Sequence, residues 1–116
     1  KNLRELNLNR NSIDEKGFRL LATSQNFKNL KVFRGSGISM GDEGFQSILN
    51  SSTLKKLEEL EVAGNTISNK SLLKLAKSAL LPQLKKIDLR RNSLNEADQL
   101  FIAQSSEFGN LKSLRF

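Results

Sequence analysis

The chain has 116 residues and a formal net charge of +7 at pH 7, and it contains no histidine and no cysteine. Without these two residue types it lacks the commonest general base, the thiolate nucleophile and most ligands for transition metals, so we expect no catalytic residue, metal or cofactor. No stretch approaches the roughly 20 apolar residues of a membrane span, so we expect no membrane association. Because small secreted domains rely on disulfides, the lack of cysteine favours an intracellular, cytoplasmic location.

A leucine returns every 27 residues without insertion or deletion, at Leu3, Leu30, Leu57, Leu84 and Leu111. A fixed period of this length predicts a solenoid of stacked units within one domain, 1–116. The repeats span 3–29, 30–56, 57–83 and 84–110, and a partial repeat spans 111–116. Solenoids normally close both ends with polar capping repeats, which are missing here. We therefore expect exposed apolar side chains at both ends and interpret the chain as an excerpt of a longer protein.

Each repeat begins with the pattern of a short strand and continues with that of a helix. In Leu6-Asn7-Leu8 apolar and polar residues alternate, as in a strand with one buried face. Apolar residues then follow at spacings of three and four, as at Phe18, Leu21 and Ala22, which gives a helix one apolar stripe. Good N-cap residues stand before each stripe, at Asp14, Gly41, Ser68 and Asn95. The predicted helices span 15–25, 42–51, 69–80 and 96–106.

Asparagine dominates the ninth position of the repeat, at Asn11, Asn65 and Asn92. Residues 3–13 fit the motif L-x-x-L-x-L-x-x-N-x-I/L at every fixed position, and this pattern resembles the leucine-rich repeat family. The 27-residue period looks most like the ribonuclease-inhibitor-like and Ran-GTPase-activating-protein-like subclasses. The resemblance implies an α/β fold, a right-handed solenoid in a horseshoe arc, with a parallel sheet of about five strands on the concave face and helices on the convex face. It also implies that the asparagines bond the backbone of the turn after each strand.

Two repeats depart from the pattern. The second has Gly35 at a core position and Ile38 in the asparagine column, which predicts a local bulge and a small packing defect. Alternatively, the segment 35–37 exposes backbone for the close approach of a partner. In the fourth repeat Gln99 replaces an apolar residue, and we expect the helix to rotate and bury Leu100 instead.

Residues 27 apart should be lateral neighbours on the concave face, because parallel strands lie about 4.8 Å apart. Basic residues outnumber acidic ones at the outward positions of this face. The candidate partner-binding residues are Arg4, Asn7, Arg10, Lys31, Arg34, Glu58, Glu59, Glu61, Lys85, Lys86, Asp88, Arg90, Arg91, Lys112 and Arg115. The rows through Glu58 and Glu61 could equally be cross-strand ion pairs. The basic residues between 85 and 115 have few acidic neighbours, and they form either a binding site or a solvated face.

These features predict a protein–protein interaction scaffold that binds another protein, one with an acidic surface, through the concave face. The resemblance to Ran-GTPase-activating proteins implies an alternative, a regulator of a small GTPase. Nucleic-acid binding by the basic stripe is a further alternative. It is disfavoured because the chain has no Trp or Tyr and most of its Phe fall in core columns, so base stacking is nearly unavailable. We expect no small-molecule ligand.

Overall fold

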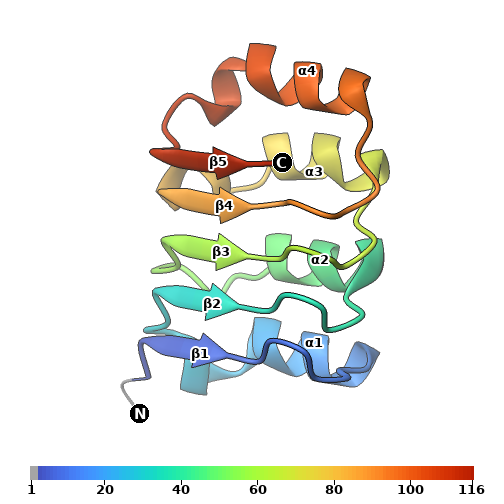
Figure 1. The fold of residues 1–116 in the computed structure, drawn as a ribbon. Helices are drawn as coiled ribbons and strands as arrows, with labels where there is room; N and C mark the ends of the chain where they lie inside the picture. Colours follow the sequence, from blue (N-terminus) through green and yellow to red (C-terminus); the bar gives the residue numbers. More distant parts are fainter. Residues whose placement is uncertain (1–2) are drawn as a thin grey trace.

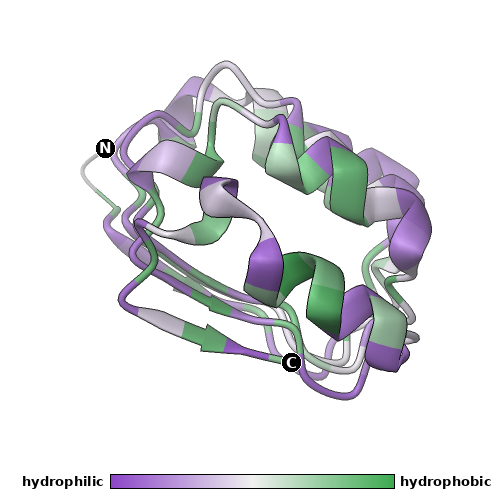
Figure 2. Cartoon of the chain, turned by 90° about the horizontal axis from the view of Figure 1, so that it is seen from above, coloured by the Kyte–Doolittle hydropathy of each residue, from purple (hydrophilic) through white to green (hydrophobic). Residues whose placement is uncertain are grey.

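The structure, a computed structural model, describes residues 3–116 as two layers, a parallel sheet and a row of helices (Figures 1 and 2). The sheet has the strand order β1-β2-β3-β4-β5, so each new strand is added beside the last. The strands are β1 (Glu5–Asn7), β2 (Val32–Arg34), β3 (Glu59–Glu61), β4 (Lys86–Asp88) and β5 (Ser113–Arg115).

The strand register confirms the 27-residue alignment of the repeats. Leu6 pairs with Phe33, Phe33 with Leu60, and Leu60 with Ile87, all in parallel. These central strand residues point toward the helices, and Phe33, Leu60 and Ile87 are at most 1% exposed. The residues on either side of them face outward, and we call this outer side of the sheet the strand face; it is the concave face of the predicted arc.

Three of the four predicted helices form close to their expected bounds. The α-helices are α1 (Glu15–Thr23), α2 (Gly41–Leu49), α3 (Leu72–Ala76) and α4 (Glu96–Gln104). Short 3-10 turns are η1 (Gln25–Phe27), η2 (Asn69–Ser71), η3 (Leu81–Gln83) and η4 (Ser106–Phe108). None of the described helices has the length and apolar character that crossing a membrane requires.

The predicted helix over 69–80 is wrong in extent. Asp42 of the preceding repeat accepts hydrogen bonds from the Ser68 amide at 2.9 Å and from the Ser71 hydroxyl at 2.6 Å. These bonds hold 69–71 in a tighter 3-10 turn, so the α-helix begins only at Leu72 and is five residues long.

The predicted N-caps are confirmed at Asp14, Ser68 and Asn95, whose side chains accept hydrogen bonds from backbone amides of the following turn. The prediction for Gly41 is wrong. Gly41 is the first helical residue of α2, and Met40 precedes it without a side-chain cap.

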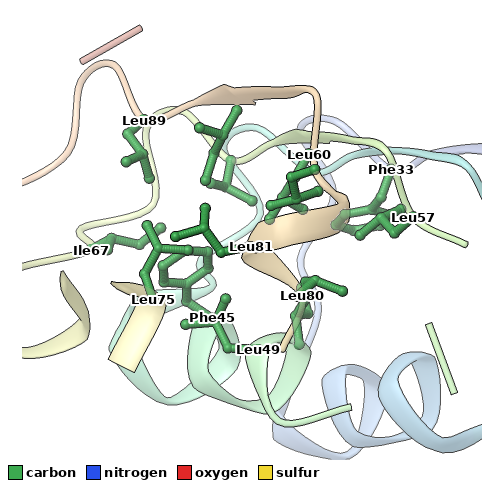
Figure 3. Close-up of a cluster of buried hydrophobic side chains, with 14 of the residues drawn as sticks. Phe33, Phe45, Leu49, Leu57, Leu60, Ile67, Leu75, Leu80, Leu81 and Leu89 are labelled. Atoms are coloured by element: carbon green, nitrogen blue, oxygen red, sulfur yellow. The ribbon is translucent and has the colours of Figure 1, made fainter. Parts of the chain in front are cut away.

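The core fills the space between the two layers (Figure 3). The predicted bulge and packing defect at Gly35 are wrong, because β2 pairs continuously with both neighbours and Ile38 is fully buried. A Cβ added at Gly35 would lie 2.6 Å from the Phe33 ring and 2.8 Å from Ile38 Cδ1. The larger side chains of this repeat therefore occupy the volume that the glycine leaves, and Gly35 itself is buried rather than open to a partner.

The expected rotation of α4 does not occur, and Leu100 is 58% exposed. Asn95 and Asp98 form a capping box with two hydrogen bonds of 2.9 Å, which fixes the start of α4. That start directs Ile102 into the core and leaves Leu100 outside. Of the apolar residues expected to be exposed at the ends, Leu3 and Phe116 are each 40% exposed, and Leu6, Leu8, Leu111 and Leu114 are half-buried.

Candidate interaction surface

The turns that follow the strands are held by the asparagine column. The Asn65 amide is buried and donates to the carbonyls of Gly35 and Ala63, while its Oδ1 accepts from the amides of Ile38 and Met40. Asn92 makes the corresponding bonds one repeat later. Asn11 donates only to two carbonyls of its own turn. The predicted structural role is thus confirmed.

The residue at the eighth repeat position has a positive φ in every complete repeat. Gly37 and Gly64 each have φ of 66°, whereas Arg10 has 63° and Arg91 has 56°. A residue with a Cβ loses about 1–2 kcal/mol in this conformation, which glycine adopts without penalty. Arg10 and Arg91 therefore occupy exposed turns in a backbone conformation that is unfavourable for a residue with a Cβ.

Three acidic residues of the strand face are bound by basic neighbours. Arg34 Nη1 lies 3.0 Å from Glu61 Oε2, and Arg34 Nη2 lies 3.9 Å from Glu5 Oε1. Lys85 Nζ lies 3.6 Å from Glu58 Oε1. These are cross-strand ion pairs of the kind expected along the Glu58 and Glu61 rows. Glu59 lies beside Lys86 in the strand register and forms no ion pair among the described residues.

Asp88 and Arg90 form the tightest of these pairs. Arg90 donates to the Asp88 carboxylate from Nε at 3.0 Å, from Nη2 at 2.8 Å and from its backbone amide at 3.1 Å. Burial alone would raise the pKa of Asp88, but these hydrogen bonds and the charges of Arg90 and Arg115 outweigh it and hold the pKa below 3.8. The Arg90 guanidinium is therefore already paired with the Asp88 carboxylate.

Of the six predicted basic residues between 85 and 115, four have no ion pair within residues 3–116. We call them the cationic cluster: Lys86, Arg91, Lys112 and Arg115. They lie on β4 and β5, immediately before β5, and in the turn after β4. The structure thus divides the predicted basic group into Lys85 and Arg90, which bind acids of the sheet, and four cations that face solvent.

Some candidate residues lie at the leading edge of the sheet, where the strands begin. Arg4, Lys31 and Glu58 line one pocket together with Lys55 and Lys56. Lys55 and Lys56 of this edge are not among the candidate residues selected from the sequence, because they precede the strands. Lys28 and Lys55 are spaced by one repeat, and that spacing was the signal that could have revealed them.

Comparison with known proteins agrees with the architecture. A family model described as "Leucine Rich repeat" matches residues 1–22 and 53–76. A solved structure titled "Leiomodin-1 Actin-Binding Site 2 (ABS2)" is similar over 96% of this chain and 68% of that chain, with a TM-score of 0.77 and 20% sequence identity. The comparison with curated proteins gives no significant match. The matched repeats and the stacked strand–turn–helix units show the α/β solenoid fold that leucine-rich repeats form.

Proposed function

We propose that this solenoid is a protein-interaction scaffold whose strand face binds a protein with an acidic surface. The observation that carries the proposal is the cationic cluster: within residues 3–116 none of its four charges forms an ion pair, and the neighbouring acids in the strand register are Glu59 beside Lys86 and Asp88 beside Arg115. Like charges held close together repel one another, and a complementary acidic surface would relieve that repulsion and speed association. The left-handed backbone at Arg91 adds support, since a glycine there would avoid the conformational cost.

The fold supports a binding role of this kind. The strands fix the side chains of the strand face, so little conformational entropy is lost when a partner docks. The similar leiomodin-1 structure is titled as an actin-binding site of that protein, which supports a protein as the class of ligand here. We do not propose a catalytic function for the chain. Membership of the ribonuclease-inhibitor-like or Ran-GTPase-activating-protein-like subclass, with a small GTPase as partner, is a narrower form of the proposal and rests on the 27-residue period.

Nucleic acid is the second candidate ligand, because the cationic cluster and the formal net charge of +7 would attract phosphates. Against it, Phe33 and Phe45 are fully buried, and among the described aromatic side chains Phe101 and Phe116 are exposed while Phe27 is half-buried. Phosphate contacts without base stacking would give binding that falls steeply as the salt concentration rises.

The proposal is tested by capture from cell extract at physiological salt, with and without nuclease. The variant Lys86→Glu/Lys112→Glu reverses two cluster charges and leaves the Lys85–Glu58 and Arg90–Asp88 pairs intact. The control Lys16→Glu/Arg19→Glu makes the same charge change at exposed positions of α1. We expect the cluster variant to retain at least about tenfold less partner than the control.

Two outcomes would count against a protein partner on the strand face. Capture that disappears after nuclease treatment would identify nucleic acid as the ligand. Equal capture by the cluster variant and the control would move the site away from the cationic cluster.

A further inference from the structure

A groove opens on the helix side of the molecule, between the ends of α2 and α3. Its apolar lining comes from Leu49, Leu54 and Leu80, which are buried, and from Leu73, which is 59% exposed. Lys55, Lys74 and Lys77 also line the groove, and all three are exposed. The accessible part of the groove therefore combines one exposed leucine, Leu73, with three positive charges, and the three buried leucines form its floor.

The groove lies where the chain leaves α3. After Ala76 the chain turns away from the helix, and Ser78 fixes the turn by donating to the Leu49 carbonyl and accepting from the Leu80 amide, both at 3.0 Å. Gln83 Nε2 donates to the carbonyls of Leu54 and Leu57 at 2.8 and 2.9 Å. The Ser78 hydroxyl and the Gln83 amide are thus bonded within the protein, so a ligand would meet Leu73, the lysine ammonium groups and the exposed side chains of Asn50 and Ser52.

The positive charge continues along the leading edge of the sheet. Two adjoining pockets share Lys55 with the groove and add Lys28, Lys31 and Lys56. Among the residues that line the three pockets Glu58 alone is acidic, and its near partner is Lys85 at 3.6 Å.

Within the protein, these lysines interact with neutral side chains or with the C-terminal end of α3. Lys74 donates to Gln46 Oε1 at 3.1 Å and Lys56 to Asn29 Oδ1 at 3.0 Å, so neither of these hydrogen bonds neutralises a charge. Lys74 and Lys77 gain from the negative C-terminal end of α3. That effect fades within one helical turn and does not account for Lys55 and Lys56.

We propose that this groove binds an acidic peptide segment of a partner protein, with one leucine-like side chain of the segment inserted beside Leu73. The carboxylates of the segment would bind Lys55, Lys74 and Lys77, and the inserted side chain would pack against Leu73. A nucleic-acid backbone offers negative charge but no aliphatic side chain to cover Leu73, so the exposed leucine favours a peptide. The groove is separate from the strand face and does not depend on the function proposed for that face.

The test measures the fluorescence anisotropy of a labelled octapeptide that has two central leucines flanked by glutamates. Lys74→Glu/Lys77→Glu reverses two of the lining charges, and Leu73→Ser removes the exposed apolar wall. We expect the charge reversal to weaken binding by about tenfold or more. We expect Leu73→Ser to weaken it by about threefold to tenfold. The control Lys16→Glu/Arg19→Glu should stay within about twofold of the unmodified chain, and far-UV circular dichroism establishes that each variant is folded.

Four results would overturn the inference. The first is no binding of the peptide at about 1 mM protein. The second is equal affinity for a peptide in which both leucines are serine. The third is binding that Lys86→Glu/Lys112→Glu abolishes and the groove variants leave unchanged, which would place the peptide on the strand face. The fourth is tighter binding of an oligothymidylate through Lys74 and Lys77, which would make the groove a nucleic-acid surface.

Discussion

Asn65 joins two neighbouring repeats through an amide side chain that is 1% exposed. Its Nδ2 donates to the Gly35 carbonyl in the previous repeat at 2.7 Å and to the Ala63 carbonyl at 3.1 Å. Its Oδ1 accepts from the amides of Ile38 and Met40 at 3.0 and 3.1 Å. Ile38 occupies the asparagine position of the second repeat, and the turn there is held by these bonds from the third repeat and by Asn9, whose Oδ1 accepts from the Ser36 amide at 2.8 Å.

The variant Asn65→Ala should therefore be strongly destabilised. It leaves four backbone groups without this partner in the interior, and we expect the free energy of unfolding to fall by about 2–4 kcal/mol. Asn11→Ala is the matched control, because Asn11 is exposed and donates to two carbonyls that water can reach; it should cost less than about 1 kcal/mol. Urea denaturation of both variants measures the difference, and equal losses would show that the column does not act through burial.

At the scale of the elements, a second polar column joins the ends of α1 and α2 to the repeats that follow them. Serine stands every 27 residues at Ser24, Ser51, Ser78 and Ser105. Ser51 donates to the carbonyl of Ala22 and Ser78 to that of Leu49, each in the preceding repeat. Ser105 departs from this pattern and donates to Phe101 within its own helix. The helices are thus held in register by side-chain bonds as well as by core packing.

Removing one of these hydroxyls should weaken the contact between adjacent repeats. We expect Ser78→Ala to lower the free energy of unfolding by about 1–2 kcal/mol, since the Leu49 carbonyl and the Leu80 amide both lose a bond. Ser105→Ala should cost under about 0.5 kcal/mol, because its bond lies within one exposed helix end. Thermal and urea unfolding compare the two, and a larger loss for Ser105→Ala would contradict a role between repeats.

At the scale of the whole molecule, stability should depend on pH through the junction of the second and third repeats. Burial alone would raise the pKa of Asp42, but hydrogen bonds from Ser68 and Ser71 and the charge of Lys70 outweigh it and hold the pKa below 3.8. A carboxyl whose folded pKa is lowered stabilises the protein above its unfolded pKa, and this contribution disappears as pH falls through the folded pKa. The pKa of Asp88 is lowered as well, so its carboxylate also contributes stability that is lost as the pH falls.

We therefore expect the free energy of unfolding to decline as pH falls below about 4, the unfolded pKa of an aspartate. Asp42→Asn should be less stable than the unmodified chain at pH 7 and should lose less on acidification, because the titrating group is gone. Glu43→Gln, an exposed neighbour on α2, serves as the control. Urea denaturation between pH 2 and pH 7 gives the profiles, and parallel profiles for Asp42→Asn and the unmodified chain would exclude this junction as the source.

Much of the candidate site could be predicted, because in a solenoid the period alone places residues side by side. Arg34 and Glu61 were expected as neighbours from their spacing of 27, and they lie 3.0 Å apart. The spacing of 27 could not predict which of the basic residues between 85 and 115 form ion pairs, because ion pairing depends on the length and conformation of each side chain. Arg90 turns back to Asp88 on its own strand, a contact that lateral rows do not predict.

The sequence by itself determined the repeat, the strand order, the register and the inward residues, since each follows from a period that every repeat obeys. The tertiary structure alone decided features that arise where neighbouring repeats differ. Phe33 and Ile38 fill the space left by Gly35, and Asp42 tightens residues 69–71 and shortens α3. Such features depend on side chains that meet across two repeats, and a pattern read within one repeat does not contain that information.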